Sequence, residues 1–252
     1  MPFLTAGGHR LEYERIDGAR DRPALILLHE GLGSIAMWRD FPAKLARATG
    51  CPAIVYSRYG YGRSDALSSP RSVDYMHREA LDTLPELRAE LGLDDAILVG
   101  HSDGASIALI HAGRGRWPVR ALVLEAPHVF VEDVSIASIA AARTAYETTD
   151  LRQRLARYHA DVDSAFRGWN DIWLDAAFRA WNIEEYLPGA RCPVLAIQGA
   201  DDEYGTLQQL DAIGRGVAGP FERLVLPECR HSPHRDQENA VLAAISRFIA
   251  RL

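Results

Sequence analysis

Cysteine is scarce in this sequence of 252 residues, which contains three of them. Cys51, Cys192 and Cys229 lie far apart, are odd in number and form no C-x-x-C pair. This usage argues against a disulfide framework and is typical of a reduced compartment. We therefore expect a cytoplasmic protein that needs neither disulfides nor a structural metal ion.

Long apolar runs and an excess of basic residues are also missing. No run approaches the roughly 18 apolar residues of a membrane span. The first residues lack the basic region and apolar stretch of a signal peptide. With 34 acidic and 28 basic residues the net charge is −6, and no basic stripe is present. We therefore expect neither a membrane nor a nucleic acid as a partner.

What the sequence does contain is an alternation of short apolar runs and helix-compatible segments. A hydrophobic content of 48% over 252 residues suffices for one sizeable core. The pattern predicts strands at 9–16, 24–28, 52–56, 97–99, 119–125, 192–198 and 222–226. It predicts helices at 35–48, 74–91, from 105 onward, at 206–214 and at 235–252. This alternation favours a mostly parallel sheet with helices on both faces.

The alternation stops between residues 128 and 188, where no strand-like run occurs. Helices are predicted there at 135–148, 150–160 and 163–180. A helical insertion of this length between two strands must pack against the rest of the protein. The open end of the sheet is the natural place for it.

Ser102 lies between Gly100 and Gly104, after the apolar run 97–99 and before a helix-compatible run. The pattern G-x-S-x-G at a strand–turn–helix junction is the nucleophile elbow. Its sharp turn requires glycine on both sides, and it exposes the serine oxygen at the end of the sheet.

A serine nucleophile needs a base, and that base needs an orienting carboxylate. In a parallel sheet such groups collect at the C-terminal ends of the strands. Asp201 and Asp202 follow the strand at 192–198, and His231 and His234 follow the strand at 222–226. The order Ser, Asp, His, each just past a strand, indicates a catalytic triad. His231 and His234 have no third ligand beside them, so we expect no metal site.

These motifs resemble the α/β-hydrolase superfamily over nearly the whole chain. The resemblance is carried by four segments, at 29–33, 100–104, 199–202 and 230–231. It implies an α/β-hydrolase fold with a helical cap inserted between the sixth and seventh strands. The core would comprise residues 1–127 and 189–252, and the cap residues 128–188.

The resemblance also implies roles for individual residues. It selects Asp202 as the triad acid, with Asp201 as the alternative, and it selects His231 over His234 as the base. The oxyanion hole would use the backbone N–H of Asp103. The second donor stays open between Gly31 and Leu32, because His29-Glu30-Gly31-Leu32-Gly33 is one residue out of step with the usual His-Gly pattern.

Five residues are candidates for lining a substrate pocket: Glu30, His128, Trp169, Trp173 and Trp181. The aromatic residues of the cap also serve its core. We expect the side chains of Glu30 and Asp103 to point away from the pocket. If either carboxylate faces the pocket, neutral esters should be better substrates than carboxylated ones.

We therefore predict a serine carboxylesterase-like hydrolase that cleaves an ester or a related acyl bond of a small molecule and needs no cofactor. On the same scaffold the resemblance also admits C–C bond hydrolases, lactonases and cofactor-free perhydrolases. The serine argues against haloalkane dehalogenases and epoxide hydrolases, which use aspartate at the elbow. A ligand-sensing protein with slow turnover is the alternative from another class. The oligomeric state, monomer or homodimer, stays open.

Overall fold

The computed structural model describes residues 2–114 and 116–252. Within these residues, eight strands form one mostly parallel sheet, as predicted. The strand order among these residues is β1-β2-β4-β3-β5-β6-β7-β8, with β2 antiparallel to both of its neighbours. All other neighbouring strands pair in parallel. The strands are β1 (Phe3–Ala6), β2 (His9–Ile16), β3 (Ala24–Leu28), β4 (Ala53–Tyr56), β5 (Ala96–His101), β6 (Ala121–Glu125), β7 (Val194–Gly199) and β8 (Phe221–Leu226).

Strands β3 to β7 are buried along their whole length, which is why they are visible in the sequence as continuous apolar runs. Strand β1 is not among the predicted strands. It has four residues, of which only Leu4 and Ala6 are buried, and it pairs with β2 at the edge of the sheet. So short a strand carries too little periodicity to be detected.

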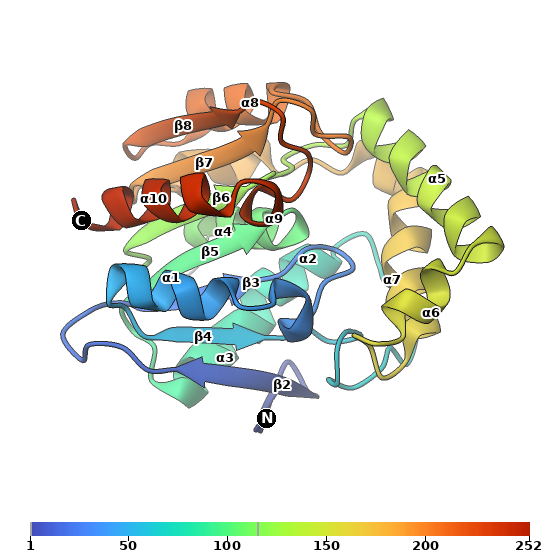
Figure 1. Cartoon of the computed structure of the whole chain (residues 1–252), viewed down its shortest axis with the longest axis horizontal. Helices are drawn as coiled ribbons and strands as arrows, with labels where there is room; N and C mark the ends of the chain where they lie inside the picture. The colour runs from blue at the N-terminus through green and yellow to red at the C-terminus, as the bar shows by residue number, and fades with distance from the viewer. Residues whose placement is uncertain (1, 115) are drawn as a thin grey trace.

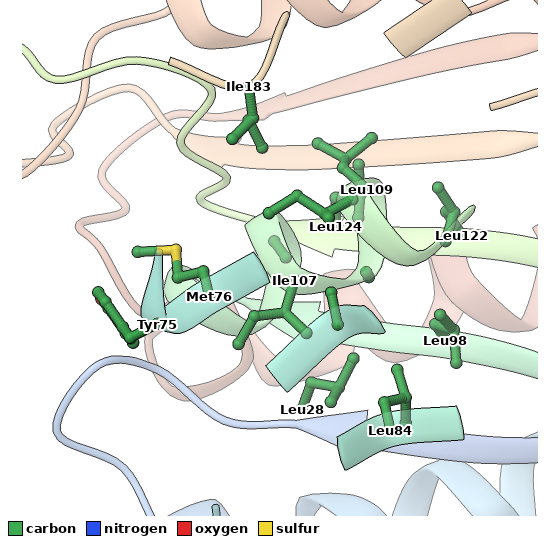
Figure 2. Packing of buried hydrophobic residues seen from close by; sticks show 14 of the residues in the cluster. Leu28, Tyr75, Met76, Leu84, Leu98, Ile107, Leu109, Leu122, Leu124 and Ile183 are labelled. Atoms are coloured by element: carbon green, nitrogen blue, oxygen red, sulfur yellow. The ribbon is translucent and has the colours of Figure 1, made fainter. Parts of the chain in front are cut away.

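Helices cover both faces of the sheet, as predicted. Strand side chains on one face of the sheet, such as Leu28 and Leu98, pack with α2 (Tyr75–Arg78), α3 (Leu84–Leu91) and α4 (Asp103–Arg114). Figure 2 shows this packing around Ile107 of α4. Strand side chains on the opposite face pack with the first and last long helices, α1 (Phe41–Thr49) and α10 (Glu238–Ile249). In Figure 1, α1 and α10 lie in front of the sheet, and α3 and α4 lie behind it.

Several predicted helices are interrupted in the structure. The segment 35–48 divides into a 3-10 turn, η1 (Ile35–Trp38), and α1, which carries Pro42 in its first turn, where a missing N–H costs nothing. The segment 74–91 contains a π-helical stretch, η2 (Glu79–Thr83), between α2 and α3. The last predicted helix likewise begins as the short α9 (Pro233–Asp236) before α10, and α8 spans Gln208–Gly216.

The segment between β6 and β7 is helical, as predicted. It comprises α5 (Asp133–Thr148), α6 (Leu151–Leu155), α7 (Val162–Leu174), and the 3-10 helices η3 (Ala176–Ala180) and η4 (Glu184–Gly189). Helix α7 is shorter than predicted, because the Asp175 side chain accepts from the amide of Ala177 and starts a separate turn. In Figure 1, α5, α6 and α7 lie beyond the C-terminal ends of the parallel strands. The division into a core and a cap stays a prediction.

The chain just before α5 and the chain between η3 and η4 meet each other. Phe130 forms an isolated antiparallel bridge with Asn182, and the amide of Ile183 donates to the carbonyl of Val129 at 2.8 Å. The segment therefore leaves and re-enters the sheet region at one place. Within residues 2–114 and 116–252, no helix combines the length and the apolar character that a membrane crossing requires.

Candidate active site

Ser102 occupies the sharp turn between β5 and α4. Its φ of 54° lies in the left-handed region, where a residue other than glycine is strained. A Cβ on Gly100 would collide with the backbone of Gly104, and a Cβ on Gly104 would collide with the carbonyl of Leu28. The two glycines therefore let β3, β5 and α4 approach closely enough for this turn, as the G-x-S-x-G pattern requires.

A chain of hydrogen bonds connects Ser102 with His231 and Asp202. The Ser102 Oγ lies 3.0 Å from His231 Nε2, and His231 Nδ1 lies 2.8 Å from Asp202 Oδ1. With the proton on Nδ1, His231 donates to the carboxylate and accepts from the serine hydroxyl. The structure therefore brings together the three side chains that the sequence placed after β5, β7 and β8.

Asp202, rather than Asp201, faces the imidazole. The amide of Tyr204 donates to Asp202 Oδ1 at 2.8 Å, and Gln198 Nε2 donates to Oδ2 at 3.1 Å. The Asp202 side chain is 1% exposed, whereas Asp201 is exposed to solvent. These contacts fix the carboxylate in the orientation that His231 requires.

Charge complementarity sets the protonation of this pair. Burial alone would raise the pKa of Asp202, but the neighbouring His231 lowers the pKa to about 2. Burial alone would lower the pKa of His231, but the Asp202 carboxylate raises the pKa above its usual value. The carboxylate therefore stays ionised and favours a protonated imidazole during a reaction.

The candidate oxyanion donors are backbone amides near Ser102. In the part of the chain that the structure describes, the amides of Asp103, Gly31 and Leu32 have no hydrogen-bond acceptor. Gly31 and Leu32 also line the cavity in front of Ser102. These N–H groups are available to an oxygen of a bound molecule, and the choice between Gly31 and Leu32 stays open.

The Asp103 carboxylate points away from the cavity, as expected. It accepts from the Tyr75 hydroxyl at 2.6 Å and from Trp173 Nε1 at 3.3 Å, and Arg58 Nη2 lies 3.7 Å from it. Asp103 is completely buried. Its negative charge is therefore balanced behind the site.

Arg58 also holds the loop that carries Gly31. Its Nη2 donates to the carbonyls of Glu30 at 2.8 Å and His29 at 3.2 Å. The His29 ring accepts from the Arg58 amide at 3.0 Å and donates to the Glu30 carbonyl at 2.6 Å. Burial, together with Arg58, lowers the pKa of His29 well below its usual value, so the ring is neutral. The sequence favoured a structural role for Arg58, but it did not predict that Arg58 holds this loop.

A cavity of about 220 Å³ opens in front of Ser102 and His231. Four of the five predicted pocket residues line it, namely Glu30, His128, Trp169 and Trp173. Trp181 is not among its lining residues, because its ring stacks on Phe178 with centroids 5.4 Å apart. This placement argues against the pocket role predicted for Trp181.

The expectation that the Glu30 side chain points away from the pocket is not met. Glu30 lines the cavity, with one carboxylate oxygen 3.4 Å from Arg235 and the other 3.6 Å from His101. Sequence reasoning also missed Glu203, Tyr204 and Arg235 as lining residues. Their positions after β7 and β8, next to the predicted acid and base, were the available signal.

A larger cavity of about 470 Å³ lies beside α7, between that helix and residues 67–71. Neither Ser102 nor His231 lines it. The smaller cavity is therefore the one in reach of the hydrogen-bonded chain. Among the described residues, no group of three or more His, Cys, Asp or Glu side chains is arranged to hold a metal ion.

Comparisons with known proteins identify the family of the chain and similar folds. A model of the alpha/beta hydrolase family matches residues 25–245. A proline iminopeptidase from Lactobacillus delbrueckii subsp. lactis is 34% identical over 112 residues, which are 44% of this chain and 37% of that protein. The chain thus matches little more than a third of the length of this relative.

Solved structures resemble the whole chain. The enol-lactonase from Burkholderia xenovorans LB400 has a TM-score of 0.76 and 21% identity, with 99% of this chain and 100% of that chain covered. A thermophilic esterase from Thermogutta terrifontis has a TM-score of 0.71 and 18% identity, with 100% and 99% covered. At these identities the likeness is one of fold.

Proposed function

Because the chain belongs to the alpha/beta hydrolase family, we propose that it is a serine hydrolase that cleaves an ester or a related acyl bond of a small molecule. The observation that carries the proposal is the hydrogen-bonded chain from Ser102 through His231 to Asp202, with links of 3.0 and 2.8 Å. Unpaired amides beside the serine support it, because an acyl-transfer reaction needs donors for the oxyanion.

In the proposed reaction, Ser102 Oγ attacks the carbonyl carbon while His231 Nε2 takes the hydroxyl proton. The developing oxyanion receives hydrogen bonds from the amide of Asp103 and from that of Gly31 or Leu32. His231 then gives the proton to the leaving group, and an acyl-enzyme on Ser102 remains. Water, deprotonated by His231, attacks the acyl carbon, and the carboxylic acid leaves as Ser102 regains its proton.

Asp202 holds the tautomer of His231 that accepts from Ser102 and stabilises the imidazolium that forms. The 2.8 Å contact with Nδ1 and the lowered pKa of Asp202, about 2, support this role. No metal ion or cofactor takes part in these steps.

The cavity supports a small acyl substrate. A volume of about 220 Å³ is below the range of roughly 300–1,000 Å³ for sites that bind drug-sized ligands. The relatives add two further bond types to test. These are a prolyl amide, from the proline iminopeptidase, and a lactone, from the enol-lactonase fold neighbour.

The test is a panel of short p-nitrophenyl esters, lactones, a prolyl p-nitroanilide and a diketone, with Ser102→Ala as the control. We expect multiple turnovers of at least one short ester by the unaltered chain. We expect Ser102→Ala to abolish both turnover and labelling by a fluorophosphonate. Labelling retained in Ser102→Ala would refute the nucleophile. Thermal shifts by these compounds without turnover would favour a ligand-sensing protein instead.

A further inference from the structure

His128 lies three residues past the C-terminal end of β6, and its backbone is firmly held. Ser106 Oγ of α4 donates to the His128 carbonyl at 2.6 Å, and the next amide, that of Val129, donates to Gln209 Oε1 at 2.8 Å. The residue is 2% exposed and lines the cavity in front of Ser102. The position of its ring is therefore set by the fold before any ligand binds.

The His128 ring lies between an apolar wall and the catalytic base. It contacts Trp173 edge to face, with centroids 5.3 Å apart, and its centroid lies 5.7 Å from that of His231. Burial lowers the pKa of His128 to about 3, so the ring is neutral near pH 7. The mechanism above does not use this imidazole.

The two ring nitrogens of His128 differ in their surroundings. Nδ1 is fully buried beside Gly205 and has no hydrogen-bond partner among the described residues. Nε2 is the nitrogen left to meet the cavity. A buried N–H without an acceptor is rarer in proteins than an unsatisfied buried acceptor. The preferred tautomer therefore carries its proton on Nε2, where the N–H can reach a ligand.

We propose that His128 determines substrate specificity by donating a hydrogen bond from Nε2 to an uncharged oxygen of the acyl group. The preferred substrates would be acyl compounds with a second oxygen, such as a keto or alkoxy oxygen, a few bonds from the scissile carbonyl. This proposal rests on the proposed function and names its substrate class.

The rest of the cavity supports an uncharged acceptor. Ile139, Trp169 and Trp173 make the neighbouring surface apolar, so a hydrocarbon chain would leave the His128 donor desolvated and unpaired. Sites built to hydrogen-bond a substrate reject analogues that lack the partner. A carboxylate is disfavoured, because two acidic side chains, Glu30 and Glu203, line the same cavity and only one basic side chain, Arg235, does.

The experiment compares isosteric substrate pairs. p-Nitrophenyl methoxyacetate and p-nitrophenyl butyrate have acyl chains of the same length. The levulinate and 4-methylpentanoate esters form a second pair, in which a methyl group replaces the keto oxygen. For each pair we define the selectivity as the ratio of kcat/KM values, corrected by the ratio of hydroxide-catalysed rates. We expect the unaltered chain to favour the oxygenated ester in at least one pair.

Three His128 variants separate hydrogen bonding from packing. His128→Phe keeps the ring and removes both nitrogens, and it should lower the selectivity by about 3- to 10-fold, the range of one neutral hydrogen bond. In His128→Gln the amide nitrogen can occupy the place of Nε2, and the selectivity should be largely retained. In His128→Asn the amide reaches only the place of Nδ1, and the selectivity should fall as in His128→Phe.

Ile139→Val is the matched control, because it alters the apolar wall without changing hydrogen bonding. Ile139→Val should change kcat/KM for both esters of a pair by the same factor, so the selectivity should stay the same. Unchanged selectivity in His128→Phe and His128→Asn, or equal loss on both esters, would overturn the proposal. If His128→Phe does not fold, the selectivities of His128→Gln and His128→Asn still test the proposal, because only the first should retain the preference for the oxygenated ester. Failure of the proposed function would differ, because no ester would then show turnover dependent on Ser102.

Discussion

The cavity in front of Ser102 has two walls of different origin. One wall consists of loops at the C-terminal ends of β3, β5, β6, β7 and β8, and it carries Ser102, His231 and the unpaired amides. The other wall consists of side chains from α5 and α7, including Ile139, Trp169 and Trp173. Groups that can react lie on the first wall, and groups that shape the available space lie on the second.

The two walls are also held in place differently. On the loop wall, Gly104 lies against the backbone of Leu28, and Arg58 binds the carbonyls of His29 and Glu30. On the helical wall, the side chain of Trp169 lies where a Cβ on Gly31 would be placed. A close backbone approach and buried hydrogen bonds hold the loop wall, whereas the helical wall meets the cavity through side chains. The second wall should therefore tolerate substitution better.

The largest effect should come from the loop wall, at the proposed acid. Asp202→Asn keeps the shape of the side chain but favours the wrong tautomer of His231, and it should lower kcat by about 1,000- to 10,000-fold. Asp201→Asn is the matched control and should stay within about 3-fold, since side chains that do not touch the reacting groups have small effects. Ester hydrolysis under saturating substrate measures both. Equal losses in the two variants would contradict the assignment of Asp202.

The second prediction compares one glycine that faces backbone with one that faces a side chain. Gly104→Ala places a methyl group against the Leu28 carbonyl and should destabilise the fold by more than about 3 kcal/mol. Gly31→Ala pushes on the Trp169 ring, which can move, so the fold should persist while kcat/KM falls by about 10- to 100-fold.

Urea unfolding and ester kinetics on both variants measure these effects. If Gly31→Ala loses as much stability as Gly104→Ala, the helical wall is as rigid as the loop wall and the proposed difference is wrong.

The third prediction concerns the loss of stability in acid. Burial lowers the pKa of His101, His111 and His159 to about 4 and that of His128 to about 3. Each folded-state pKa lies below the unfolded value, so the unfolded chain binds protons first. The folded state therefore has its full stability, as far as these histidines decide it, above about pH 6.5. As the pH falls from there toward 4, the free energy of unfolding decreases by about 1.4 kcal/mol per pH unit for each histidine.

Urea titrations at pH 7, 6 and 5 measure how the free energy of unfolding changes with pH. They also test whether the loop wall and the helical wall unfold together. Side chains of α7 share one hydrophobic core with those of β3 and β5. Tryptophan fluorescence and far-UV circular dichroism should therefore report the same transition at each pH. Two separated transitions at pH 5 would show that the walls unfold independently.

The smallest effect concerns the charge of the cavity. Glu30, Glu203 and Arg235 line it, which leaves one negative charge in excess. p-Nitrophenyl butyrate should therefore be a better substrate than mono-p-nitrophenyl succinate. Glu30→Gln should improve the relative kcat/KM of the succinate by about 2- to 5-fold at low salt and by less at high salt. Equal or better turnover of the succinate by the unaltered chain would contradict this.

The sheet could be predicted from the sequence because its strands are buried. Strands β3 to β7 are continuous apolar runs, and Ser102, Asp202 and His231 each follow a strand, so their convergence at one edge was predictable. β1 could not be predicted, because four edge residues carry almost no pattern.

The helical wall was less predictable. An amphipathic pattern shows that a tryptophan is buried but not what it is buried against. Trp173 and Trp181 therefore looked alike in the sequence, although Trp173 lines the cavity and Trp181 stacks on Phe178. The contacts of Arg58 depend on loop conformations that no periodicity encodes.

The bridge between Phe130 and Asn182 has a consequence for replacing the helices between these two residues. Because these two parts of the chain bond to each other, the sheet is joined to the helices through two adjacent attachment points, whatever lies between them. Helices of another length or sequence could be transplanted between these points without shifting the register of β6 against β7. On the proposed function, we expect a chimera that keeps residues 1–130 and 182–252 to act on a different range of substrates.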